Sequence, residues 1–202
     1  MRPVLLITML ALAGCGAMAP REHSRTDASP EPFFDGNELV MPERMAGAVA
    51  QNSGRFRNLG PEDFNAGTNT TVLGDKRVYP GDALHRPWAL LGDFDGDGYR
   101  DAALLQASPD SGRAIVVTGN AAPRTIELVR WNPTKEVDLS SSRGRFLVAA
   151  PAGPVSAPLF AGTPRETTFR IEHEGIALAN WGTAAQTYFW RDDHFENVQT
   201  AD

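Results

Sequence analysis

The chain concentrates its carboxylates in one short run, DFDGDGYRD, which begins at Asp93 and ends at Asp101. Carboxylates at alternate positions, with glycines where the backbone must turn sharply, form an oxygen cage for a hard divalent cation. Ca²⁺ suits such a cage best, since it accepts roughly six to eight oxygen ligands in a flexible geometry. The expected ligands are the side chains of Asp93, Asp95, Asp97 and Asp101 and the backbone carbonyl of Tyr99.

The segment Asp93–Asp101, called the cation loop below, is not an EF-hand loop. An EF-hand places a bidentate glutamate at the twelfth loop position, whereas this chain has Leu104 there. Helices flank an EF-hand loop, but Trp88–Leu91 and Ala102–Gln106 have the short apolar pattern of strands. The cation loop is therefore expected to join two strands, where a bound ion would act as a structural clamp.

The strand–loop–strand pattern resembles the calcium site of FG-GAP and VCBS-type repeats. The resemblance covers about Trp88–Leu105 and implies that the same four aspartates and the Tyr99 carbonyl hold Ca²⁺. In that family several repeats usually assemble into a β-propeller, whose blades are four-stranded sheets. This chain has no second copy of the motif and no internal repeat, so a full propeller is not expected. A subunit that supplies partial blades to an oligomeric propeller is one alternative.

The N-terminus has the features of an export signal. Arg2 precedes an apolar run, Val4–Leu12, that is too short to cross a bilayer. The next residues, Leu12-Ala13-Gly14-Cys15, resemble the lipobox of bacterial lipoproteins, which implies a signal peptide over residues 1–14 and a lipid on Cys15. The resemblance also implies an outer-membrane lipoprotein facing the periplasm, because Gly16 replaces the aspartate of inner-membrane lipoproteins.

Residues 15–33 are expected to form a tether between the lipid and the domain, since they are rich in polar and small residues without apolar periodicity. Cys15 is the only cysteine, so no intramolecular disulfide can form. An ordinary secreted protein with a cysteine near its cleavage site is the alternative. The formal net charge of −6 argues against nucleic acid as a partner, because that binding depends on Lys and Arg.

Residues 34–202 are expected to form a single, mainly β domain with one short N-terminal helix. Helical periodicity covers Glu38–Gln51, where Pro42 suits an early turn and Gly54 a stop. Later segments favour an antiparallel meander, a sandwich or a propeller-blade-like sheet. The Pro-, Ala- and Gly-rich stretch 150–166 is expected to be a long surface loop and a candidate binding edge. The expected strands are Trp88–Leu91, Ala102–Gln106, Ala114–Thr118, Thr125–Trp131, Arg145–Ala149, Thr167–Ile171, Ile176–Asn180, Gln186–Trp190 and Phe195–Thr200.

The chain shows none of the common catalytic motifs for a serine elbow, a zinc protease or a phosphate loop. Binding or scaffolding in the cell envelope, with a protein or glycan partner, is therefore the expected function. The aromatic run Tyr188–Trp190 suits a carbohydrate platform or, more commonly at strand spacing, a core. The alternative function is hydrolysis of an envelope polymer by some of His173, Glu174, Asp192 and His194.

Overall fold

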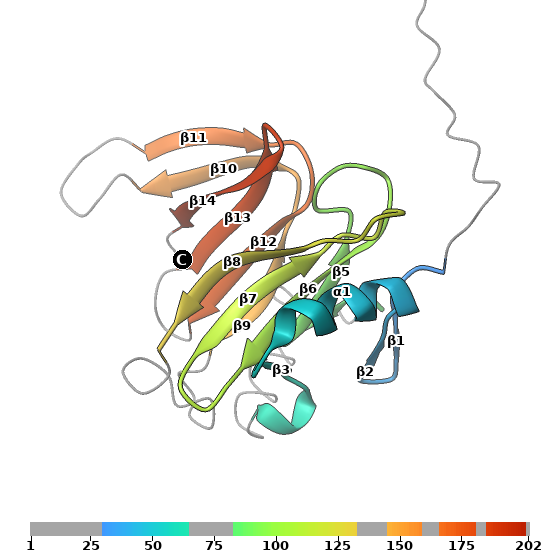
Figure 1. Ribbon diagram of the computed structural model, residues 1–202. Helices are drawn as coiled ribbons and strands as arrows, with labels where there is room; N and C mark the ends of the chain where they lie inside the picture. The colour runs from blue at the N-terminus through green and yellow to red at the C-terminus, as the bar shows by residue number, and fades with distance from the viewer. Residues whose placement is uncertain (1–29, 65–82, 133–144, 159–165, 181–184, 201–202) are drawn as a thin grey trace, which may run out of the picture.

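The computed structural model describes residues 30–64, 83–132, 145–158, 166–180 and 185–200 (Figure 1). Within these residues the protein is mainly β, with antiparallel sheets and one α-helix, which confirms the fold class expected from the sequence. The expected signal peptide, Cys15 and most of the tether lie outside the described residues. In the described ranges no helix is both long enough and apolar enough to cross a membrane.

The larger sheet is an antiparallel meander in which β4, β5, β6, β7 and β8 follow one another in sequence order. A further short strand, β3, pairs with the end of β6 that β5 leaves free. The expected strands in this region are confirmed to within two residues at each end. The bounds are β3 Arg57–Asn58, β4 His85–Arg86, β5 Ala89–Gly92, β6 Asp101–Ala107, β7 Gly112–Val117 and β8 Thr125–Trp131.

The smaller sheet has the strand order β14-β13-β12-β9, again with antiparallel neighbours. Two separate two-stranded sheets, β1-β2 and β10-β11, complete the strands of the structure. The bounds are β1 Phe33–Asp35, β2 Glu38–Val40, β9 Arg145–Ala150, β10 Gly153–Pro158, β11 Glu166–Ile171, β12 Gly175–Asn180, β13 Ala185–Arg191 and β14 His194–Thr200.

The stretch 150–166 corrects one expectation. It was expected to be a surface loop, but it contains β10, which pairs with β11 from Gly153 opposite Ile171 to Pro158 opposite Glu166. Proline is tolerated in an edge strand, where one side of the backbone needs no hydrogen-bond partner. The composition of this stretch predicted a loop, but the stretch forms a strand because β11, which follows it in the chain, supplies the hydrogen-bond partners.

The helix α1 (Glu43–Ser53) corrects a second expectation. It was expected to begin near Glu38, but Glu38–Val40 form β2 and pair with β1. Pro42 explains the difference, because the residue before a proline is pushed out of the helical region and proline itself fits only the first turn. The helix ends before Gly54, whose φ of 53° is in the left-handed region.

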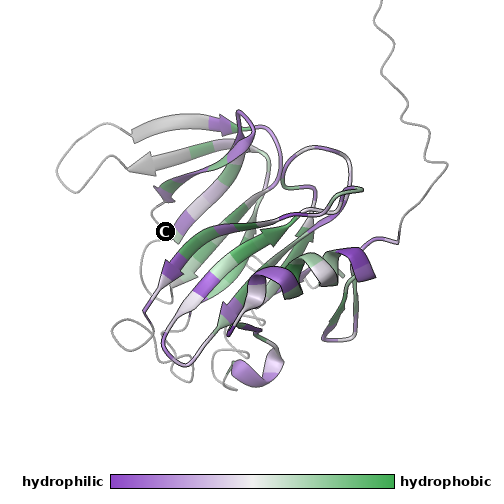
Figure 2. Ribbon diagram, viewed as in Figure 1, coloured by the Kyte–Doolittle hydropathy of each residue, from purple (hydrophilic) through white to green (hydrophobic). Residues whose placement is uncertain are grey.

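The core joins the helix to both main sheets. The central strands β6 and β7 are buried along almost their whole length, without alternation, because both of their faces are covered. Met45, Ala48 and Val49 of α1 pack on one side, and residues of the smaller sheet such as Leu147 and Ile176 belong to the same cluster. Figure 2 shows hydrophobic residues concentrated in the central strands, whereas α1 contains both hydrophilic and hydrophobic residues.

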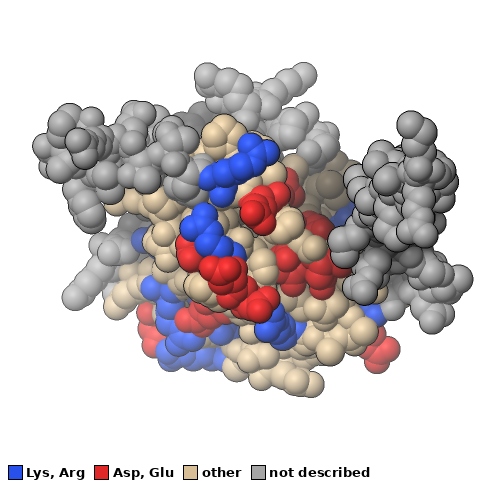
Figure 3. Space-filling view, turned by 90° about the horizontal axis from the view of Figure 1, so that it is seen from above, with Lys and Arg blue, Asp and Glu red and all other residues tan. Residues whose placement is uncertain are grey.

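Four turns gather at one end of the molecule, at the top of Figure 1. They join β5 to β6, β7 to β8, β11 to β12 and β13 to β14. Seen from above, this end presents acidic side chains next to basic ones across its centre (Figure 3). Turns held at one end of a rigid sheet are a common location for binding sites.

Candidate metal centre

The cation loop joins β5 to β6, as expected, and its last aspartate is the most deeply buried. Asp101 is fully buried as the first residue of β6, opposite Gly92. Both of its carboxylate oxygens accept backbone hydrogen bonds: Oδ2 from the N–H of Phe94 at 2.9 Å and Oδ1 from the N–H of Gly119 at 2.8 Å. Asp101 therefore links the start of the cation loop to the turn after β7.

Three of the expected ligands come together. Asp93, Asp95 and Asp101 each offer a carboxylate oxygen, and these oxygens lie within 4.8 Å of one another. Asp93 Oδ2 accepts the N–H of Gly98 at 3.0 Å, while Asp93 Oδ1 is buried and has no hydrogen-bond partner. A buried carboxylate oxygen without a partner costs free energy unless a cation or a donor satisfies it.

Asp97 has a different place in the loop. Its side chain is exposed, and its oxygens accept hydrogen bonds from the N–H of Tyr99 at 2.9 Å and from Asn120 Nδ2 at 3.0 Å. It is not a member of the three-carboxylate group. The Tyr99 side chain is 45 % exposed, so the expected contribution of this residue is its carbonyl alone. Asp97 thus links the loop to the β7–β8 turn.

The two loop glycines are required by the backbone path. Gly96 has a φ of 74° and Gly98 a φ of 85°, both in the left-handed region that side chains disfavour. A Cβ atom at Gly96 would also lie 2.3 Å from the ring of His173, whereas one at Gly98 would meet nothing within 4 Å. Glycine at position 96 therefore serves both the turn and the close approach of His173.

The electrostatics of the loop favour a cation. Burial and the charge of Asp95 raise the pKa of Asp101 from 3.8 to about 8, although the backbone N–H groups of Gly119 and Phe94 act in the opposite direction. Burial and the charge of Asp97 likewise raise the pKa of Asp95. Crowded carboxylates hold their protons in this way when no positive charge is near.

The local arginine does not neutralise the cluster. Arg100 is the only basic residue within the cation loop, and its guanidinium turns away to Glu31, at 3.1 Å, and to the Pro32 carbonyl. None of the four aspartates takes part in an ion pair with a described Lys or Arg. The unpartnered Asp93 oxygen and this missing counter-charge fit an oxygen-preferring divalent cation.

Residues from other turns complete the surroundings, and sequence reasoning missed them. Gly119 must lack a side chain because a Cβ there would lie 2.1 Å from the Arg100 carbonyl oxygen. The β11–β12 turn covers the loop through His173, on Gly96, and Glu174, whose Oε2 would lie 2.2 Å from a Cβ at Gly92. A Gly-Asn pair after a strand is a recognisable turn signal, but nothing in the sequence places His173 or Glu174 here.

The four residues considered for hydrolysis make different contacts. Glu174 lies 3.6 Å from His85 Nε2, and His194 Nδ1 contacts the Asp192 carbonyl at 3.0 Å. His173 and Asp192 line one hollow of about 290 Å³ with Arg170, Glu172, Phe189, Trp190 and Arg191.

The aromatic run of β13 contributes mainly to packing. Tyr188 and Phe189 are buried, with 2 % and 5 % exposure, and Trp190 makes an edge contact with Phe195 at 5.0 Å between ring centroids. The expected hairpin between β13 and β14 is confirmed, with Asp192 and Asp193 at φ values of 48° and 63°. These angles are those of a type I′ turn, which matches the twist of paired strands.

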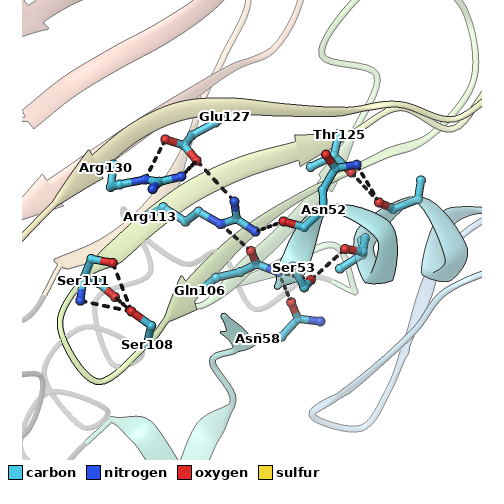
Figure 4. A network of polar contacts seen from close by, with 12 residues as sticks. Asn52, Ser53, Asn58, Gln106, Ser108, Ser111, Arg113, Thr125, Glu127 and Arg130 are labelled. Atoms are coloured by element: carbon cyan, nitrogen blue, oxygen red, sulfur yellow. Dashed lines mark hydrogen bonds and ion pairs between the residues drawn. The ribbon is translucent and has the colours of Figure 1, made fainter. Parts of the chain in front are cut away.

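A second polar cluster lies on the helix-facing side of the large sheet (Figure 4). The buried Arg113 donates to Gln106 Oε1 at 2.7 Å, to the Asn52 carbonyl at 2.9 Å and to Glu127 Oε2 at 3.2 Å. Its guanidinium also stacks on Phe56 at 4.2 Å. This cluster is called the Arg113 network below. Glu127 balances the charge of Arg113 within the chain, so the cluster needs no ligand.

Comparison with known protein families, curated proteins and solved structures finds no match for this chain.

Proposed function

We propose that this protein binds Ca²⁺ in the cation loop and that the ion clamps β5 to β6. Asp93, Asp95 and Asp101 supply the central oxygens. Asp97 and the Tyr99 carbonyl complete the set after a small adjustment of the loop. The observation that carries the proposal is the buried Asp93 Oδ1, which has no partner inside a cluster without counter-charge.

The role of the ion is structural. Asp101 already anchors the backbone of Phe94 and Gly119, so a cation on this carboxylate would stiffen the loop and the β7–β8 turn together. Ca²⁺ is preferred to Mg²⁺ because a loop of carboxylates and a carbonyl suits a large ion with flexible coordination better than strict octahedral geometry.

At the level of the whole protein, we infer a calcium-stabilised lipoprotein of the bacterial cell envelope that binds or scaffolds a protein or a glycan. The support is the lipobox with Cys15, the polar segment 15–33 and the gathering of four turns at one end of the sheets. A lipid anchor followed by a spacer leaves such an end free to meet a partner near the membrane surface.

The calcium proposal is tested by titrating chelator-treated protein with Ca²⁺ and, separately, with Mg²⁺ in a calorimeter. We expect one site that prefers Ca²⁺, and a higher midpoint of thermal unfolding when the site is filled. Asp95→Asn should abolish both effects. Asp193→Asn is the matched control, because it removes the same charge from an exposed turn outside the cluster. An unchanged melting midpoint in Ca²⁺ would contradict the proposal.

The lipid anchor is tested independently. Cys15→Ser should move the protein from the membrane fraction to the soluble fraction of its bacterial host, without altering the calcium-dependent melt. A variant that stays in the membrane fraction would contradict the anchor and leave the calcium site untouched.

A further inference from the structure

A hollow of about 520 Å³ opens beside the large sheet, away from the cation loop. Its walls are the β1–β2 hairpin and the 3-10 helix η1 (Pro61–Asp63), which lie below α1 in Figure 1. Its floor is the part of β5 and β6 around Ala89 and Leu104, at the opposite end of β5 from Gly92. The volume lies within the range of about 300–1,000 Å³ that is typical of ligand pockets.

The floor of the hollow is apolar and firmly packed. Leu59, Trp88 and Leu104 line it while being only 4 %, 3 % and 1 % exposed. The Trp88 ring is held by Phe64 at 5.7 Å between centroids. Leu39 of β2 adds an apolar wall. A ligand would therefore bind to an apolar surface that is already ordered in the free protein.

The rim of the hollow is acidic. Asp35, Glu38 and Glu62 line it and are exposed, and none of their carboxylates forms a hydrogen bond or an ion pair with a described side chain. The neighbouring Asp63, by contrast, is held by Arg57 through two hydrogen bonds, one of them at 2.7 Å. Arg57 is therefore held mainly by Asp63, although the charge of Glu62 also acts on it, and the three rim carboxylates are exposed to solvent.

A strand edge lies beside this rim. In the described part of the chain β2 pairs only with β1, so one edge of β2 has no strand partner. Glu38 and Leu39 belong to β2 and line the hollow. An extended peptide is able to pair with such an edge while its side chains enter an adjacent pocket.

We propose that this hollow binds an extended segment of a partner protein that presents an arginine or lysine beside an apolar side chain. The apolar side chain covers Trp88 and Leu104, and the cation lies among Asp35, Glu38 and Glu62. A long basic side chain suits this site because its methylene stem packs on apolar surface while its charged end reaches the acidic rim. The site is independent of the calcium proposal.

The test uses the full chain in detergent and the blocked tripeptide acetyl-Leu-Arg-Leu-amide as the probe. Calorimetry at low salt compares it with the same peptide carrying citrulline, which keeps the shape of arginine without its charge. We expect the arginine peptide to bind about fivefold more tightly, with the advantage reduced by added salt. Equal affinity of the two peptides, or no binding of either, would overturn the proposal.

Variants locate the site. Glu38→Gln combined with Glu62→Gln should remove the advantage of the arginine peptide, and both positions are exposed, so the fold should tolerate the change. Glu172→Gln combined with Asp193→Asn changes the net charge equally at the other end of the molecule and should have no effect. The proposal fails if both double variants behave alike.

A small polycation separates the two parts of the site. Spermidine carries charge without an apolar side chain, so it should bind more weakly than the arginine peptide and should not perturb the Trp88 indole or the Leu104 methyl resonances. If spermidine binds as tightly and produces the same perturbations, the apolar floor has no role and the peptide is the wrong occupant.

Discussion

Two polar clusters of the described residues lie at opposite ends of β6 and β7, and they differ in how their charge is balanced. At one end Gln106 and Arg113 face each other across the strands, as residues in register. At the other end Asp101 begins β6, and Gly119 follows shortly after β7. The same pair of strands thus supports one cluster that is complete within the chain and one that is not.

The Arg113 network is complete because partners arrive from several elements. The side-chain oxygen of Gln106 accepts a hydrogen bond from Arg113, and its amide nitrogen donates one to Asn58 Oδ1 at 2.7 Å. Glu127 of β8 is shared by Arg113 and Arg130, which lowers the pKa of its carboxyl. Arg113 is a buried arginine whose hydrogen bonds to α1, β6 and β8 are satisfied, so it ties the helix to the sheet.

The cation loop lacks such partners. Its carboxylates accept backbone hydrogen bonds, but none of them pairs with a described Lys or Arg. Asp93 Oδ1 is buried and has no hydrogen-bond partner. The Arg113 network balances the charge of a buried arginine within the chain, whereas the cation loop has no such counter-charge among the described residues, and the calcium proposal rests on this difference. That difference leads to four predictions.

The largest effect is expected from breaking the complete cluster. Arg113→Ala should lower the free energy of unfolding by ~3 kcal/mol, because the side-chain oxygen of Gln106 and the Asn52 carbonyl both lose their donor and the packing on Phe56 is removed. Arg130→Ala is the control, since this exposed arginine also pairs with Glu127 but should change stability little. Urea unfolding measures both, and the loss at Arg113 should be the same with and without Ca²⁺.

The second effect, unlike the first, should depend on whether Ca²⁺ is present. Asp93→Asn should leave the stability in chelator unchanged or slightly higher, because the amide oxygen keeps the Gly98 hydrogen bond and one repelling charge is removed. In Ca²⁺ at about a hundred times its Kd, the variant should lack the stabilisation of about 2.7 kcal/mol that the ion gives to the parent protein. A variant that keeps the calcium response would show that Asp93 is not a ligand.

The pH dependence follows from the raised pKa of Asp101. In chelator the folded protein keeps this proton up to about pH 8, whereas the unfolded chain releases it near 3.8. Between these values the unfolded state binds fewer protons, so the contribution of Asp101 to stability falls as pH rises. Ca²⁺ competes with the proton, and its affinity should therefore be higher at about pH 8 than at about pH 5. Thermal melts over this range, with Asp101→Asn as the control, measure both trends.

The smallest effects come from two glycines in opposite environments. Gly98→Ala should cost about 1 kcal/mol, because alanine disfavours a φ of 85°, although space for the methyl group is open. Gly47→Ala, in the middle of α1 with nothing within 4 Å, should add about 0.5–1 kcal/mol of stability. Equal shifts in the two variants would contradict the backbone argument for the cation loop.

Local patterns were sufficient to predict most strands and the grouping of three of the aspartates. The expected strand Thr125–Trp131 is observed with the same bounds, and Asp93, Asp95 and Asp101 do meet. Local patterns failed where a distant partner decided the outcome. The Pro-rich stretch 150–166 contains β10, which pairs with β11, and Glu38–Val40 form a strand with β1 instead of joining the helix.

By itself the sequence determined the cation loop, because alternating aspartates and glycines dictate a tight turn whatever surrounds it. It also determined the lipobox pattern, the net negative charge and the β-rich periodicity. Only the tertiary structure decided which oxygens are buried together, that Arg100 turns to Glu31, and that His173 lies on Gly96. The physical reason is that burial and charge balance depend on residues far apart in the chain, which no local spacing encodes.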